Sequence, residues 1–206
     1  TAQSVSGPIT VYGGNINLNA SLTATGVTLA SSGTVSNGAS GFVSANELLL
    51  QGGNVTLSHA SNAVATLAAS GVGNLSLSNS GALTVGTVDT TQGLAATGTV
   101  SLSTVTGNLT IAQGITTSLT NSATALTLNA GASSAVGTIT GGNIIISGSP
   151  IVTVGSGSTA RLFSGGVSGS TGLSTLAGLG LGSGRFRYKS DESSTGYTQA
   201  LQSGLN

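Results

Sequence analysis

One short repeated motif constrains the fold of this chain more than any other feature. Gly-Asn followed by an apolar-x-apolar triplet occurs five times, with its Asn at Asn15, Asn54, Asn74, Asn108 and Asn143. The first apolar position of the motif recurs early in the chain at Ile16, Val35, Val55 and Leu75, where Val35 belongs to a variant without Asn. These positions are roughly 19–20 residues apart, a period that indicates a repeat protein in which each repeat packs on its neighbours.

The residues after each Asn alternate as they do in a half-buried β-strand. In Leu75-Ser76-Leu77 the apolar side chains point to one face and the Ser side chain points to the other. Three short strands per coil of about 20 residues would form a parallel β-helix, because each strand pairs with its equivalent about 4.8 Å above and below. No segment has an apolar stripe at helical spacing, so we expect an all-β solenoid with very little helix.

The later part of the chain departs from this regular spacing. The steps from Leu75 to Leu109 and from Leu109 to Ile144 are each about 35 residues long, well above the early period. These distances predict longer coils, insertions or a coil that has lost its Asn, as around Ala125-Leu126-Thr127-Leu128. The register between about residues 80 and 140 therefore stays open.

The composition favours an ordered repeat over a disordered chain. Of 206 residues, 34 are Gly and only 4% are charged, but 38% are hydrophobic and the formal net charge is zero. Disordered chains combine low hydrophobicity with high net charge or abundant Pro. The absence of Cys excludes disulfides and thiolate metal sites. No apolar run reaches the ~20 residues of a membrane helix, so no membrane insertion is expected.

Two interpretations of the motif Asn residues follow from their backbone chemistry. Gly and Asn both tolerate the left-handed conformation that a sharp corner requires. The five Asn residues would then be turn residues and nothing more. Alternatively, if they lie at one corner of the coil, some of them would stack as amide ladders along the axis.

A different kind of segment begins near residue 183, where charged and aromatic residues alternate. In a strand the cations would lie on one face and the aromatic rings on the other: Arg185, Phe186, Arg187, Tyr188 and Lys189. The rings could cover an open core, and the charges would oppose pairing at the strand edge. We therefore divide the chain into a β-solenoid shaft, residues 1–182, and a cap or junction segment, residues 183–206.

These features together resemble the filamentous-haemagglutinin-like family of large bacterial surface proteins. The resemblance is carried by the Gly-Asn motifs, by the opening Pro8-Ile9-Thr10-Val11-Tyr12-Gly13-Gly14-Asn15-Ile16 and by the Arg-Phe-Arg-Tyr segment, and it covers essentially the whole chain. It implies a right-handed parallel β-helix exported by two-partner secretion. It also implies display on the bacterial cell surface, adhesion or filament formation, and no catalytic residues.

The residues themselves offer little material for catalysis or for a metal site. His59 is the single His, and Glu47 and Asp89 stand alone in the sequence. Neither a Ser-His-Asp triad nor the paired carboxylates of a glycosidase is therefore expected. Two Asp residues are too few for a calcium-binding β-roll. We expect no enzyme activity, no metal and no cofactor.

The function expected from the sequence is a non-catalytic structural shaft of an extracellular bacterial adhesin or surface filament. Its partners would be further copies joined end to end, with residues 185–206 on the neighbour's first coil, or neighbouring modules of a larger surface protein. A host or environmental glycan is a further candidate partner, and nucleic acid is not expected. A carbohydrate-binding adhesive surface and an ice-binding solenoid with a regular Thr array remain as alternative functions.

Overall fold

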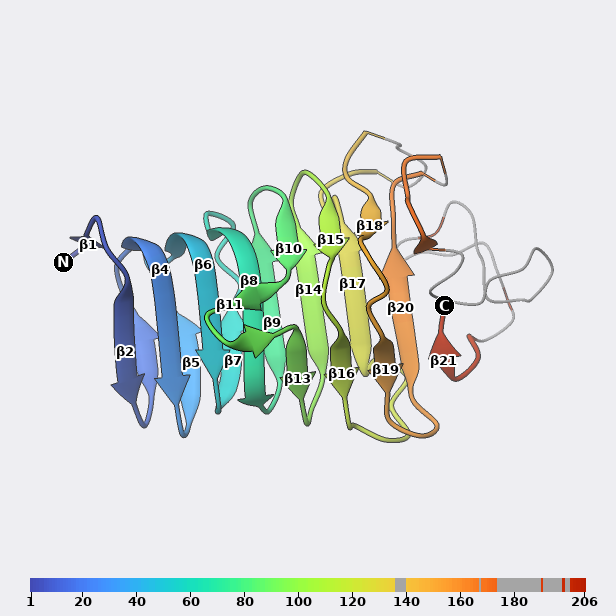
Figure 1. The fold of residues 1–206 in the computed structure, drawn as a ribbon, viewed down its shortest axis with the longest axis horizontal. Coiled ribbons are helices and arrows are strands. Elements are labelled where there is room, and N and C mark those ends of the chain that lie inside the picture. The colour runs from blue at the N-terminus through green and yellow to red at the C-terminus, as the bar shows by residue number, and fades with distance from the viewer. Residues whose placement is uncertain (136–139, 167, 174–189, 191–197, 199–200) are drawn as a thin grey trace.

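The computed structural model describes residues 1–135, 140–166, 168–173, 190, 198 and 201–206. Its regular elements are all β-strands, which succeed one another along the long axis from β2 to β20 (Figure 1). Within two large sheets every neighbouring pair of strands is parallel, as the registers of β4 with β6 and of β7 with β9 show. For the residues that the structure describes, the prediction of an all-β fold with parallel pairing is confirmed.

The two sheets hold the following strands. Sheet A contains β1 (Gln3–Ser4), β2 (Ile9–Gly13), β4 (Leu22–Ser31), β6 (Val43–Gln51), β8 (Ala63–Val72), β10 (Leu83–Val85), β13 (Leu94–Ala96), β15 (Leu109–Ile111), β16 (Ile115–Thr117), β18 (Ile144–Ile146) and β19 (Val152–Val154). Sheet B contains β3 (Ile16–Leu18), β5 (Thr34–Asn37), β7 (Asn54–Leu57), β9 (Leu75–Asn79), β14 (Val100–Thr104), β17 (Leu126–Ala130), β20 (Thr159–Phe163) and β21 (Gly204–Leu205). An antiparallel pair, β11 (Thr87–Val88) and β12 (Thr91–Gln92), stands apart.

From β3 to β20 the chain passes alternately through sheet B and sheet A. We call one strand of sheet B, together with the sheet A strands that follow it, a repeat. Sheet B pairs Ile16 with Val35 and Val55 with Leu75, so the first repeats have the expected length. The repeats then lengthen, because Leu75 pairs with Val100 and Leu126 pairs with Ala160. The expected period therefore holds only as far as β9.

Sheet A explains part of the lengthening. The strands β4, β6 and β8 are 10, 9 and 10 residues long, so the early repeats have two strands rather than the expected three. The strand β8 then pairs with two short successors, β10 and β13, which are separated by the β11–β12 hairpin. Insertions at this bend give three strands per repeat from β9 onward.

The core lies between the two sheets and consists of stacked apolar positions. In β9 the side chains of Leu75 and Leu77 are 1% exposed, whereas Ser76 lies on the outer face. The partners of Leu75 across the sheet, Val55 and Val100, are also buried, so equivalent positions stack along the axis. Burial of each Leu contributes about 1.5–3 kcal/mol, and most of the buried apolar side chains form one continuous cluster.

A second, smaller cluster lies on the outside of sheet A. Leu49 points away from the main core, between the inward-facing Leu48 and Leu50. It is covered by Val88 of the hairpin, which also covers Ala68 on β8. The hairpin therefore acts as a local lid over an apolar patch that the alternation of β6 alone would leave in water.

Candidate functional site

The five motif Asn residues lie at two corners of the repeat. Asn15, Asn54 and Asn74 stand at the start of β3, β7 and β9 in sheet B. Asn108 and Asn143 stand before β15 and β18 in sheet A. Leu75 and Leu109 therefore belong to different sheets, which is why the long step between them is not the length of a repeat. We name the sheet B set, with Thr34 and Thr99 at equivalent positions, the sheet B column.

In both sets the Asn side chain bonds to the backbone of the next repeat. The Oδ1 atom of Asn15 accepts the N–H of Thr34 at 2.9 Å. That of Asn54 accepts the N–H of Asn74 at 2.8 Å, and that of Asn74 accepts the N–H of Thr99 at 2.8 Å. In sheet A the Oδ1 of Asn108 accepts the N–H of Asn143 at 2.9 Å. These bonds join side chain to backbone, whereas an amide stack would join side chain to side chain.

Each Asn of the column is matched by a Gly in the following repeat. A Cβ atom on Gly33 would overlap the Oδ1 of Asn15. Gly73 has the same relation to Asn54, and Gly98 has it to Asn74. These three glycines have no positive φ. Gly is needed at these positions because a larger side chain would overlap the Asn amide of the preceding repeat, and not because of the backbone conformation. The Gly of one repeat and the Asn of the repeat before it therefore form one contact.

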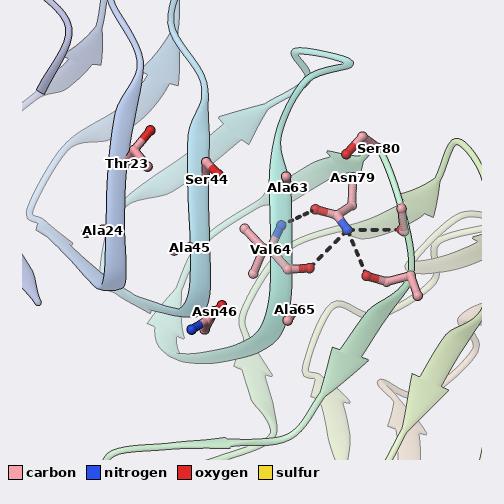
Figure 2. A pocket seen from close by; sticks show the side chains of 12 residues that line it. Thr23, Ala24, Ser44, Ala45, Asn46, Ala63, Val64, Ala65, Asn79 and Ser80 are labelled. Atoms are coloured by element: carbon pink, nitrogen blue, oxygen red, sulfur yellow. Dashed lines mark hydrogen bonds between the residues drawn. The ribbon is translucent and has the colours of Figure 1, made fainter. Parts of the chain in front are cut away.

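Two buried Asn residues do not belong to the motif. Asn62 stands at the corner before β8, and Asn79 stands at the corner between β9 and β10. Asn62 is fully buried, donates to the carbonyls of Leu57 and Ser78, and accepts the N–H of Val43 at 3.0 Å. Asn79 accepts the N–H of Val64 at 2.8 Å and donates to its carbonyl at 3.0 Å, as Figure 2 shows. The burial of Asn79 could have been predicted from the alternation of its strand, because Leu75, Leu77 and Asn79 point to the same face.

A shallow groove of about 440 Å³ crosses the outside of sheet A near Asn79. Thr23, Ser44 and Ala63 lie side by side in it on β4, β6 and β8 (Figure 2). Its lining has small, uncharged side chains and no aromatic ring: Thr23, Ala24, Ser44, Ala45, Asn46, Ala63, Val64, Ala65, Asn79, Ser80, Gly81 and Ala82. Such a lining provides hydroxyl and amide groups but no stacking platform for a sugar ring.

The outer face of sheet B carries rows of small polar side chains. Asn17 pairs with Ser36, Ser36 with Thr56, and Thr56 with Ser76. The same row continues through Ser101 to Thr127. Asn, Ser and Thr alternate irregularly here, so this row differs from the regular Thr array that an ice-binding face would use.

His59 and Asp89, which were considered as catalytic candidates from the sequence, lie in a corner and in a hairpin turn. The Nδ1 atom of His59 accepts the N–H of Ser61 at 3.1 Å, and its Nε2 atom lies 3.2 Å from the carbonyl oxygen of Ala39. Its ring stacks on Phe42 with centroids 5.6 Å apart. Asp89 stands in the hairpin turn with a φ of 52°. In the described part of the chain no three His, Cys, Asp or Glu side chains gather as metal ligands.

The expected cap residues, Arg185, Phe186, Arg187, Tyr188 and Lys189, lie outside the described residues, as does the boundary expected near residue 183. The described C-terminal residues place β21 beside β20, with Gly204 opposite Thr159. Within the described residues, no helix has the length and apolar character needed to cross a bilayer.

At the amino end of the strand stack, the described strands have unpaired edges. At the amino end, β1 and β2 pair only with β4, and β3 pairs only with β5, among the described residues. Ile9, Val11 and Leu18 pack on the core there but remain partly exposed. We call these strands and side chains the amino-terminal face. Its free strand edges and apolar side chains are chemically suited to pair with a further strand.

Comparison with known proteins gives no relative: no family model, no curated protein and no solved structure matches this chain.

Proposed function

We propose that this chain is a right-handed parallel β-helix that serves as the non-catalytic shaft of an extracellular bacterial adhesin or surface filament. The observation that carries the proposal is the mutual dependence of the repeats. The backbone N–H groups of Thr34, Asn74 and Thr99 are each satisfied by an Asn of the preceding repeat. A repeat of this kind has no stable core of its own and is stabilised by extending the stack.

The surface of the described repeats supports a structural role. Stacked rows such as Ser36, Thr56 and Ser76 place identical or similar uncharged groups about 4.8 Å apart, where like charges would repel. His59 is hydrogen-bonded to backbone atoms, and Asp89 accepts only the hydroxyl of the neighbouring Thr90 among the described residues. The function of such a rod would be to hold the segments at its two ends at a fixed distance from each other.

The assignment to a bacterial surface rests on the resemblance of the Gly-Asn motifs and the Pro8 to Ile16 opening to filamentous-haemagglutinin-like proteins. Neighbouring modules of a larger surface protein are then the natural partners of both ends. A glycan-binding surface is less well supported, because the groove on sheet A lacks aromatic side chains.

The proposal is tested by immunogold labelling of intact cells of the bacterium that encodes the chain, with an antibody against folded residues 1–135. We expect label outside the cell envelope without permeabilisation. Label that requires permeabilised cells would contradict the extracellular assignment. Electron cryo-microscopy of the chain tests the helical path separately, and a left-handed path or two flat sheets without a continuous winding would contradict the β-helix.

A further inference from the structure

The amino-terminal face contains a vacant copy of the Gly-Asn site that joins the later repeats. In the sheet B column, where a repeat carries Asn, the Gly of the next repeat faces that Asn side chain. The space beside Gly33 is filled by Asn15, and the space beside Gly73 is filled by Asn54. Gly14 occupies the equivalent position before Asn15, and a Cβ atom there would meet no atom within 4 Å.

The backbone donor at this site is also left without an acceptor. The N–H groups of Thr34, Asn74 and Thr99 point toward the preceding repeat and are bound by its Asn Oδ1. In the remaining repeat Asn54 donates instead to the carbonyl of Gly33. Asn15 stands at the equivalent position of the first repeat, and within the described residues its N–H has no hydrogen-bond acceptor. Space, donor and strand edge therefore coincide at one place.

We propose that the amino-terminal face is a docking surface for one further repeat of this type, whose sheet B strand carries Asn at the column position. The Oδ1 of that Asn would occupy the space beside Gly14 and accept the N–H of Asn15. The apolar-x-apolar triplet after it would cover Ile16 and Leu18 and pair with β3 in parallel. The inference deepens the proposed shaft function and rests on it.

The described residues of a second copy of this chain do not provide the same chemistry. Among them the last strand of sheet B is β21, and its register with β20 places Gly204 at the column position. Gly204 has no side chain to fill the space beside Gly14. The nearby Asn206 amide is used within its own chain, where it donates to the carbonyls of Gln202 at 2.8 Å and Gly204 at 3.0 Å. The occupant is therefore a repeat that carries Asn.

The experiment adds such a strand to the full chain. A copy of residues 15–21 replaces residues 1–2 and runs directly into Gln3. In the natural chain residue 21 is followed by Leu22, and Leu22 pairs with Gln3. A copy of residues 15–21 that ends directly before Gln3 is therefore in register with the original residues 15–21. Amide hydrogen exchange of Asn15 is the readout, with the Thr34, Asn74 and Thr99 amides as internal references.

In the natural chain we expect the Asn15 amide to exchange faster than the three reference amides. In the extended chain we expect its exchange to slow by at least about tenfold, because the bond has formed. Replacing the first residue of the copy, the copied Asn15→Ala, should remove this protection. Gly14→Ala should change the unfolding midpoint little in the natural chain and should lower it in the extended chain.

Unchanged exchange of Asn15 in the extended chain, or an equal effect of Gly14→Ala in both chains, would overturn the docking proposal. Neither result would affect the immunogold test of the shaft. Sedimentation of the natural chain at several concentrations tests whether a second copy of the chain binds to the amino-terminal face. Concentration-dependent association that Gly14→Ala weakens would identify a second copy as the partner and would also overturn the proposal.

Discussion

At the scale of the residue, the motif gains its meaning from pairs of residues in different repeats. Asn54 and Gly73 belong to consecutive repeats, and each restricts what the other position can hold. The Asn supplies an acceptor for the N–H of Asn74, and the Gly leaves the space in which the Asn side chain lies. A net contribution of about 1 kcal/mol is usual for one such bond.

The space requirement is tested by Gly73→Ala. We expect a loss of about 1–3 kcal/mol, since the new Cβ atom would overlap the Asn54 amide. Gly81→Ala is the matched control, because a Cβ there meets nothing within 4 Å. Urea denaturation measures both changes. In the double variant with Asn54→Ala the two losses should be less than additive, and strict additivity would show that the two residues do not share this space.

Asn79 differs from the column residues because its amide is buried. Asn79→Ala would remove the side-chain partner of both the N–H and the carbonyl of the buried Val64. We expect a loss of about 2–4 kcal/mol in thermal or urea unfolding. Asn74→Ala is the comparison, since Asn74 is exposed and water can replace its Oδ1. A larger loss at Asn74 than at Asn79 would contradict the assignment.

At the scale of the element, alternation assigns each strand one face in the core and one in water. The strand β9 is the clearest case, with Leu75 and Leu77 buried and Ser76 outside. The strand β6 is one exception, because Leu48, Leu49 and Leu50 are all buried, and β8 and β17 also contain runs of consecutive buried residues. The exception in β6 is explained by the hairpin, whose Val88 covers the outward-facing Leu49.

The register of β9 predicts unequal effects of the same charge at neighbouring positions. Leu75→Asp would bury an unpaired carboxylate and should cost several kcal/mol, on the order of the penalty for an unpaired buried charge. Ser76→Asp should cost less than about 1 kcal/mol, because its side chain lies on the outer face. The midpoint of urea denaturation measures both. Equal losses would contradict this register, and a larger loss at Ser76 would show that the strand is inverted.

At the scale of the whole molecule, parallel strands in two sheets make each repeat depend on its neighbours along one axis. In sheet B the separation of hydrogen-bonded positions in adjacent repeats increases from 19 between Asn15 and Thr34 to 34 between Thr127 and Arg161. The added residues lie in insertions such as the hairpin, while the paired positions stay stacked. Interactions between nearest neighbours therefore dominate the stability.

Pulling the chain from its two ends should release it in steps that correspond to repeats. We expect length increments of roughly 65 Å for the early repeats and roughly 115 Å for the repeat from β17 to β20, from the reach of an extended chain. Single-molecule force spectroscopy measures these increments. Release of the whole chain in one step would contradict nearest-neighbour unfolding.

Much of the fold could be predicted from local features of the sequence. The inward positions of Leu75 and Leu77 and the successive pairing of Ile16, Val35, Val55 and Leu75 agree with the structure. Both follow from properties that a few neighbouring residues carry, namely alternation and a short regular period. Parallel pairing followed from the same period, since equivalent strands must run in the same direction.

Only the tertiary structure decided which sheet each Asn joins and what each Gly is for. Asn74 and Asn108 have the same local motif, but Leu75 pairs with Val100 in sheet B and Leu109 pairs with Leu83 in sheet A, so the two Asn residues stand at different corners of the repeat. The partner of Asn79 is on β8, and the space beside Gly14 is defined only by comparison with Gly33, Gly73 and Gly98. The sequence by itself determined the local strand pattern and the early period, because these depend on near neighbours. Contacts between repeats depend on the lengths of the turns between them, and local patterns do not encode those lengths.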